Sequence, residues 1–152
     1  ILLLVMTLLG LASLRGTILE ERMTSSLLDR SLAFQSAETA LREAEAVLAP
    51  GPTFPAAGCA AGLCARPDPA LPERWLDASF TGWRPATTNQ EAKVGQPAWF
   101  VEAMGEGPNW ALCDTEIPVS PNCLKARYRI SARSDSTNGR AAILLQTTYA
   151  AF

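Results

Sequence analysis

The chain contains no histidine, and its only lysines are Lys93 and Lys125. Histidine is the commonest general base and the commonest transition-metal ligand in proteins, so its absence removes both roles at once. A serine or cysteine nucleophile would then need a lysine or a carboxylate as its base. The GxxxxGKS phosphate loop, the GxGxxG turn and the spacing of a calcium loop are also missing. We therefore expect no enzyme activity, no catalytic residue, no metal site and no cofactor.

A strong excess of charge is missing as well. The 152 residues carry a formal net charge of −2 at pH 7, so bulk attraction to nucleic acid or to anionic lipid is not indicated. A chain of this length suits one compact domain with an appendage. Nucleic acid is therefore not the expected partner.

Charge is absent from residues 1–14 altogether, and no turn signal follows until Pro-Gly-Pro at residues 50–52. This pattern predicts one continuous helix that ends at Leu48. Such a helix is about 70 Å long at 1.5 Å per residue, too long for a small globule to enclose, so its N-terminal half must protrude. Fourteen helical residues span about 21 Å, less than the roughly 30 Å of a bilayer core. We therefore expect the chain to begin inside a transmembrane segment.

A cleaved signal peptide explains this start less well, because residues 13–19 continue the helix and offer no break after a small-residue cleavage site. Small residues on the apolar segment permit close approach of other helices. Each glycine also weakens the helix by about 1 kcal/mol relative to alanine, so local opening of the helix is a second possible use, and ordinary tolerance of glycine in a membrane span is the third. The residues predicted to lie in a membrane or in a filament core are Ile1, Leu2, Leu3, Leu4, Val5, Leu8, Leu9, Gly10, Leu11, Leu14 and Gly16.

The second half of the predicted helix is amphipathic. Apolar residues recur there at steps of three, four and seven, which places them on one side of a helix, while Glu38, Arg42, Glu43 and Glu45 fall on the opposite side. We expect the apolar side to pack on a sheet. The predicted core between helix and sheet consists of Leu27, Phe34, Ala37, Leu41, Ala44, Leu48, Tyr128 and Ile130.

Strand signals follow residue 97. Residues 98–104 predict a first strand, residues 125–133 alternate between apolar and polar, and residues 141–149 are a third, more continuously apolar strand, while Asn138-Gly139 indicates a turn. Residues 109–113 are a candidate for a shorter fourth strand. The predicted fold class is α+β, with the long helix packed on an antiparallel sheet of three to four strands.

This interpretation divides the chain into residues 1–22, the membrane or filament-core half of the helix, and residues 23–152, a globular domain. Within the domain we expect the helix at 23–49, a long loop at 50–96 and the sheet at 97–152. The loop contains Trp75, Phe80 and Trp83. Their rings either fasten the loop onto the domain or bind a partner.

Four cysteines allow three disulfide pairings. Pairing between near neighbours needs the least loop closure, so we favour Cys59–Cys64 and Cys113–Cys123. Disulfides persist outside the reducing cytosol, which agrees with an exported domain. Free or metal-bound thiols are the alternative, but neither couple has the CxxC spacing of a zinc site.

One basic stripe is visible in the sequence. Lys125, Arg127, Arg129 and Arg133 fall on the outward side of their predicted strand. One interpretation is that they bind an acidic partner or a DNA backbone. The alternative is that they form a solvated sheet face, with their charge balanced by acids such as Glu102.

Five stretches carry a family resemblance: residues 2–12 (LLLVMTLLGLA), 17–23 (TILEERM), 29–43 (DRSLAFQSAETALRE), 128–133 (YRISAR) and 145–149 (LQTTY). Together they resemble the type IV pilins, and most closely the PilX minor pilins. The first two are similar to the family's transmembrane stretch and the signature that follows it. The third is similar to its AFQAAEAALRE-like run, and the last two are similar to its closing hairpin.

The resemblance implies a subunit that is made as a prepilin, trimmed by prepilin peptidase and held in the bacterial inner membrane by one span, with its globular domain in the periplasm. It implies that the helix then binds other minor and major pilins in a complex that primes assembly of the pilus, or fimbrium, on the cell surface. Such a complex presents a PilY-type adhesin at the tip and serves cell adhesion and twitching motility. A minor pseudopilin of a type II secretion system and a membrane-anchored periplasmic binding domain that does not polymerise are the alternatives.

Overall fold

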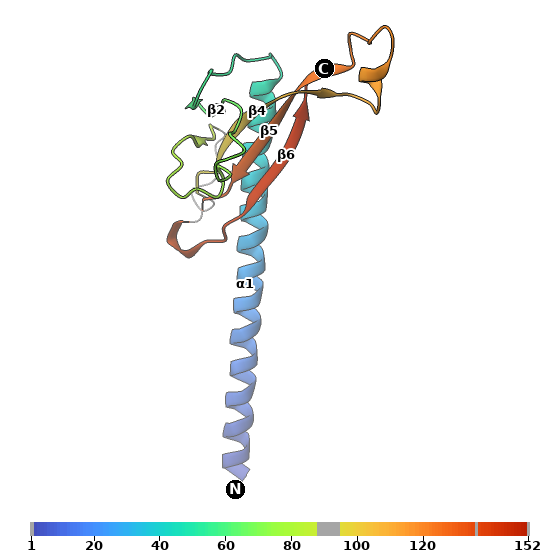
Figure 1. Ribbon diagram of the computed structural model, residues 1–152. Coiled ribbons are helices and arrows are strands. Elements are labelled where there is room, and N and C mark those ends of the chain that lie inside the picture. The colour runs from blue at the N-terminus through green and yellow to red at the C-terminus, as the bar shows by residue number, and fades with distance from the viewer. Residues whose placement is uncertain (1, 88–94, 136, 152) are drawn as a thin grey trace.

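The computed structural model describes residues 2–87, 95–135 and 137–151, and the side chains of residues 8, 9, 11–15 and 138 lie outside this description. Its longest element is the helix α1, Leu2–Leu48, of 47 residues. The continuous helix predicted from the sequence is therefore confirmed, including the join between the apolar segment and the domain. Figure 1 shows the first half of α1 standing clear of the sheet. The helix ends where Gly51 adopts a left-handed φ of 71° and donates its N–H to the carbonyl of Leu48.

Over the described residues the sheet has six strands and is mixed, so the prediction of three to four antiparallel strands is wrong in both respects. The strand order is β1-β2-β4-β5-β6, with β3 paired to β4, and β2 runs parallel to β4. The additional strands are two-residue segments inside the long loop, too short to leave a period in the sequence. The strands are β1 Cys59–Ala60, β2 Leu63–Cys64, β3 Arg84–Pro85, β4 Ala98–Pro108, β5 Leu124–Arg133 and β6 Leu144–Ala150.

The predicted strand at residues 109–113 is also wrong. Leu112 has a left-handed φ of 64° and precedes the short 3-10 helix η1, Cys113–Thr115, which an extended segment could not accommodate. By contrast β4 continues to Pro108, because a register shift between Ala103 and Gly105 lets it keep its pairing with β5. The strand β6 begins at Leu144, because the N–H groups of Ala141 and Ile143 donate to the side chains of Asp29 and Ser134.

The core lies where α1 crosses the hairpin of β5 and β6 and the adjoining β4. The helix contributes mainly alanines, which bring its backbone close to the sheet. Ala37, Ala44, Leu48 and Ile130 are buried, and Leu41 and Tyr128 pack against the buried cluster. The cluster itself consists of Ala40, Ala44, Leu48, Ala86, Trp99, Val101, Ile130 and Ala132.

The prediction that Leu27 and Phe34 belong to the core is wrong, because these residues are 66% and 47% exposed. Leu27 precedes Asp29, which accepts a hydrogen bond from Ala141 of the domain. Phe34 lies to one side of the alanine stripe. Large apolar side chains therefore did not identify the core residues of the helix, because a close contact between helix and sheet has room only for small side chains.

The alanine stripe gives a testable prediction. We expect Ala44→Leu to lower the free energy of unfolding by about 1–3 kcal/mol, because the extra methylenes have no space in a filled core. Ala46→Leu, on the exposed side of the same helix, is the matched control and should change it by less than about 0.5 kcal/mol. Urea unfolding followed by tryptophan fluorescence measures both, and equal effects would contradict the close contact.

Candidate functional site

The most prominent candidate surface is the N-terminal half of α1. Its described side chains are exposed around the whole helix, with large apolar groups on every side rather than in one stripe. Water does not tolerate such a surface, since each fully exposed leucine costs roughly 1.5–3 kcal/mol relative to burial. The exposed large apolar residues of this half are Leu2, Leu3, Leu4, Val5, Met6, Ile18, Leu19 and Met23, and Leu27 and Leu28 continue the exposed surface just beyond it.

Several residues predicted for this surface cannot be placed in it. Ile1 lies outside the described residues, as do the side chains of Leu8, Leu9, Leu11 and Leu14. Among the residues that the structure describes, no helix combines the length and the apolar character needed to cross a membrane.

The two glycines of this segment lie on open helix surface. A Cβ atom added at Gly10 or Gly16 would meet no other atom within 4 Å. Their small size is therefore not used for packing inside the described chain, and both positions are accessible to another helix.

Two carboxylates of α1 hold the rest of the helix to the domain. Asp29 accepts the N–H of Ala141 at 2.7 Å and the Nε–H of Arg140 at 3.4 Å, where the connection between β5 and β6 meets the helix. Glu43 accepts the indole N–H of Trp99 at 3.1 Å and the backbone N–H of Thr87 at 2.8 Å. The prediction that Glu43 lies on the outward side of the helix is therefore wrong. These bonds fix the direction in which the protruding half leaves the globule.

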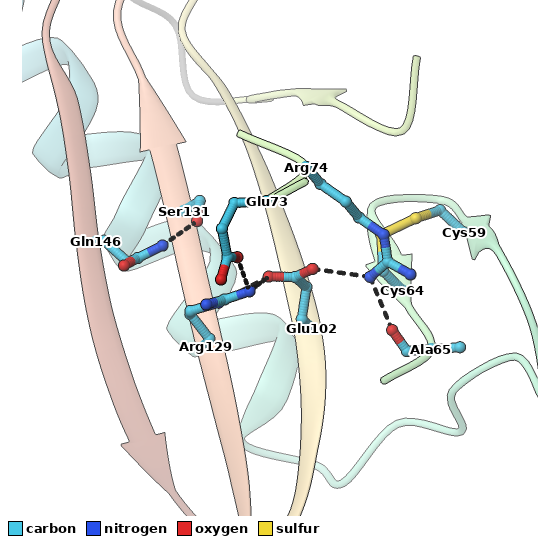
Figure 2. Close-up of polar contacts among 9 residues, drawn as sticks. All are labelled: Cys59, Cys64, Ala65, Glu73, Arg74, Glu102, Arg129, Ser131 and Gln146. Carbon is cyan, nitrogen blue, oxygen red and sulfur yellow. Dashed lines mark hydrogen bonds and ion pairs between the residues drawn. A yellow bond between two sulfur atoms is a disulfide. The ribbon is translucent and has the colours of Figure 1, made fainter. Parts of the chain in front are cut away.

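A buried ionic cluster holds the long loop to the outward face of the sheet (Figure 2). The Glu102 carboxylate of β4 is fully buried and accepts hydrogen bonds from Arg74 at 2.8 Å and from the Arg129 Nε at 2.8 Å. Arg129 also pairs with Glu73, and Arg74 also donates to the carbonyl of Ala65, next to the Cys59–Cys64 disulfide. Burial disfavours the charge of Arg129, but its hydrogen bonds to Glu73 and Glu102 outweigh burial and raise its pKa.

The basic stripe of β5 is thus largely engaged within the chain. Besides the pairing of Arg129, the guanidinium of Arg127 donates to the carbonyl of Pro108 at 2.6 Å, and that of Arg133 lies 4.2 Å from the ring centre of Trp83. Burial lowers the pKa of Arg133, against the opposing charge of Asp135. Lys125 is half-buried near the start of the strand. These contacts favour the interpretation in which the charges of the basic stripe are balanced by partners within the chain.

The aromatic residues of the long loop pack mainly on β4. The rings of Phe80 and Trp83 meet Phe100 edge to face at 4.9 and 4.7 Å between centroids. Trp75 is half-buried. The fastening role therefore accounts for Phe80 and Trp83.

Both predicted disulfides are present, Cys59–Cys64 and Cys113–Cys123. The first joins β1 to β2. The second closes a loop that projects from the sheet at the end remote from the helix N-terminus (Figure 1). This projecting loop, residues 109–123, carries exposed apolar side chains at Leu112 and Ile117, the latter 98% exposed.

The sequence interpretation missed the carboxylate contacts. Asp29, Glu73 and Arg74 were not singled out, and Glu102 was noted only as a counter-charge to the basic stripe. One signal was available, since a lone carboxylate inside an apolar strand must be paired if it is buried. Arg129 had been noted in the basic stripe that Glu102 was expected to answer, but Arg74 was not predictable, because it comes from a loop without periodicity.

Comparison with known proteins identifies a family for the N-terminal segment. Residues 1–42 match the family described as PilX N-terminal, which supports a PilX-type pilin over this N-terminal segment. No curated protein matches the chain significantly, and no solved structure does.

Proposed function

We propose, from the premise that residues 1–42 are those of a PilX-type pilin, that this protein is a minor pilin acting in type IV pilus assembly. In this proposal the helix is held in the inner membrane before assembly and in a bundle of pilin helices afterwards, with the globular domain in the periplasm and then on the pilus. The subunit belongs to an assembly-priming complex at the tip, and its role requires no catalysis.

The observation that carries the proposal is a single helix with two environments. From Ala33 to Leu48 α1 is buried against the sheet on one side, whereas the described side chains of its first half are exposed. An apolar helix of this kind can leave lipid only if it enters another apolar environment, since exposure to water costs roughly 1.5–3 kcal/mol for each leucine. A bundle of similar helices supplies those surroundings, and exposed Gly10 and Gly16 allow close approach.

The rigid join between helix and domain supports the same role. Asp29 and Glu43 tie α1 to two separate parts of the domain. The position of the helix in a bundle therefore determines where the globular domain lies on the filament surface.

The projecting loop supports a place at the tip. It lies at the end of the molecule opposite the helix N-terminus (Figure 1). If that N-terminus points toward the membrane, the exposed Leu112 and Ile117 point away from it, toward the end where a PilY-type adhesin would sit. A surface partner there would cover apolar area that the described chain leaves open.

The test is complementation of a deletion strain. We expect deletion of the gene to reduce surface pili, and wild-type protein to restore them. Ile18→Asp should fail to restore them, because it places a charge on the exposed helix surface where packing between helices is apolar. Ile18→Leu is the matched control and should restore them. Pili are counted by electron microscopy, with equal protein levels and retention in the membrane fraction checked by immunoblot.

Three outcomes would contradict the proposal. Normal piliation and twitching in the deletion strain would exclude a required priming role. Full complementation by Ile18→Asp would show that the helix surface is not used in assembly. A loss of protein secretion with normal pili would favour the pseudopilin alternative.

A further inference from the structure

The strand β6, Leu144–Ala150, forms one edge of the sheet. It pairs with β5 alone, and no backbone hydrogen bond from its other side is present among the described residues. Figure 1 shows this edge on the side of the sheet away from the long loop. An edge strand presents unpaired N–H and C=O groups, which make it a template for another strand.

The bonds at the two ends of this ladder show which groups point outward. Ser134 donates to the carbonyl of Ile143, and Ala151 donates to the carbonyl of Ala126, so the odd-numbered residues of β6 bond to β5. Hydrogen-bonded and non-hydrogen-bonded pairs alternate in an antiparallel ladder. The N–H and C=O groups that face away from β5 therefore belong to the even-numbered residues: Leu144, Gln146, Thr148 and Ala150.

This edge lacks the usual protection. Natural edge strands are blunted by charged residues, proline, bulges or short length. The seven residues of β6, LLQTTYA, contain neither charge nor proline, and their pairing with β5 has no register shift. The opposite edge of the sheet, β1, has only two residues and is closed by the disulfide from Cys59. Among the described residues, the edge at β6 is therefore a whole strand, without charge, proline or bulge, that is open to strand addition.

The strand is also complementary to itself. Residues at equal distances on either side of Thr147 are chemically similar. Gln146 and Thr148 are polar, Leu145 and Tyr149 are large and apolar, and the terminal residues Leu144 and Ala150 are apolar. An antiparallel pair centred on Thr147 opposes each residue to its match, with no like charges, and pairs all seven residues. It also sets Gln146 opposite Thr148 as a hydrogen-bonded pair, which agrees with their outward backbone groups.

We propose that β6 pairs with β6 of a second copy of this chain, forming a two-fold dimer with one continuous sheet. The two-fold axis runs perpendicular to the sheet beside Thr147, so both helices lie on the same face and point in opposite directions. The dimer therefore joins copies that do not lie side by side in one bundle of parallel helices. This inference does not depend on the proposed role in pilus assembly.

Disulfide trapping in the full oxidised chain, in detergent, tests the register. Thr147 faces its own copy across the axis as a non-hydrogen-bonded pair, for which Cα atoms lie about 4.5 Å apart, within reach of a disulfide. We expect Thr147→Cys to give a covalent dimer on non-reducing gels after mild oxidation. Thr148→Cys is the matched control, because its partner is Gln146, and it should stay monomeric. Equal cross-linking of both variants, or of neither, would overturn the proposal.

A second variant separates strand pairing from association through the apolar helix. The N–H of Thr148 points outward, so Thr148→Pro removes an edge donor without removing a bond to β5. We expect loss of the wild-type dimer, measured by analytical ultracentrifugation in detergent, with an unchanged melting temperature. Thr147→Pro removes a bond to β5 and should lower the melting temperature. A dimer that persists in Thr148→Pro, or a wild-type chain that is monomeric throughout, would contradict the pairing.

Discussion

Glu102→Gln is expected to lower the free energy of unfolding by about 3–5 kcal/mol, the cost of breaking a buried ion pair by removing one partner. The carboxylate of Glu102 is fully buried between Arg74 and Arg129. An amide keeps the shape but loses the charge, and its NH2 group meets guanidinium donors where an oxygen accepted them. Two guanidinium groups then remain in a partly buried site with half of their counter-charge. Urea unfolding followed by tryptophan fluorescence measures the change.

The matched control for this prediction is Glu38→Gln. Glu38 pairs with Arg42 at 3.5 Å on the surface of α1, where the two side chains are 46% and 68% exposed. Such surface pairs contribute about 0–1 kcal/mol, so the control should change stability little. A small effect of Glu102→Gln, similar to the control, would show that the cluster does not hold the long loop. Protection of loop amides from hydrogen exchange should fall only in Glu102→Gln.

Trp99→Ala is expected to cost about 3–5 kcal/mol, because truncating a fully buried tryptophan loses its burial and leaves a cavity. Trp99 is fully buried in β4 and joins three parts of the fold. It bonds Glu43 of the helix, and the guanidinium of Arg84 in β3 lies 5.1 Å from its ring centre. The ring also requires glycine at position 62, where a Cβ atom would lie 3.0 Å from Trp99 and 2.7 Å from Arg84.

The same substitution at Trp110 is the control for Trp99. Trp110 is 42% exposed and donates one hydrogen bond to Glu116 at 3.0 Å. Its loss should cost about 1 kcal/mol or less, the net value of one exposed hydrogen bond. Differential scanning calorimetry compares the two variants without relying on tryptophan emission. A melting temperature for Trp99→Ala no lower than that of Trp110→Ala would contradict the central position of Trp99.

The helix and its end were predictable from local sequence. Helix formation depends on residues a few positions apart, and residues 1–48 contain no proline that would interrupt it. The hairpin of β5 and β6 was predictable for a similar reason, since the alternation in residues 125–133 is local. The near-neighbour disulfides followed from the short separation of their cysteines, 5 and 10 residues.

The contact between helix and sheet was only partly predictable. Apolar periodicity favoured Leu27 and Phe34, but the sheet covers only the last part of α1 and meets it through alanines. A period shows which residues share a side of a helix. It does not show where along the helix a partner begins, or how closely that partner approaches.

The sequence alone determined that α1 is one continuous helix with two environments. Helix continuity and apolar character depend on residues that are close together in the sequence, so the lack of charge and of turn signals was enough to predict them. Only the tertiary structure decided how the domain is held to α1 and which edge of the sheet is left open. Glu102 finds its partners 28 and 27 residues away, and Asp29 finds Ala141 at a separation of 112. Such contacts depend on the order of the strands and on the path of a loop without periodicity, which bring distant residues together only in the folded chain.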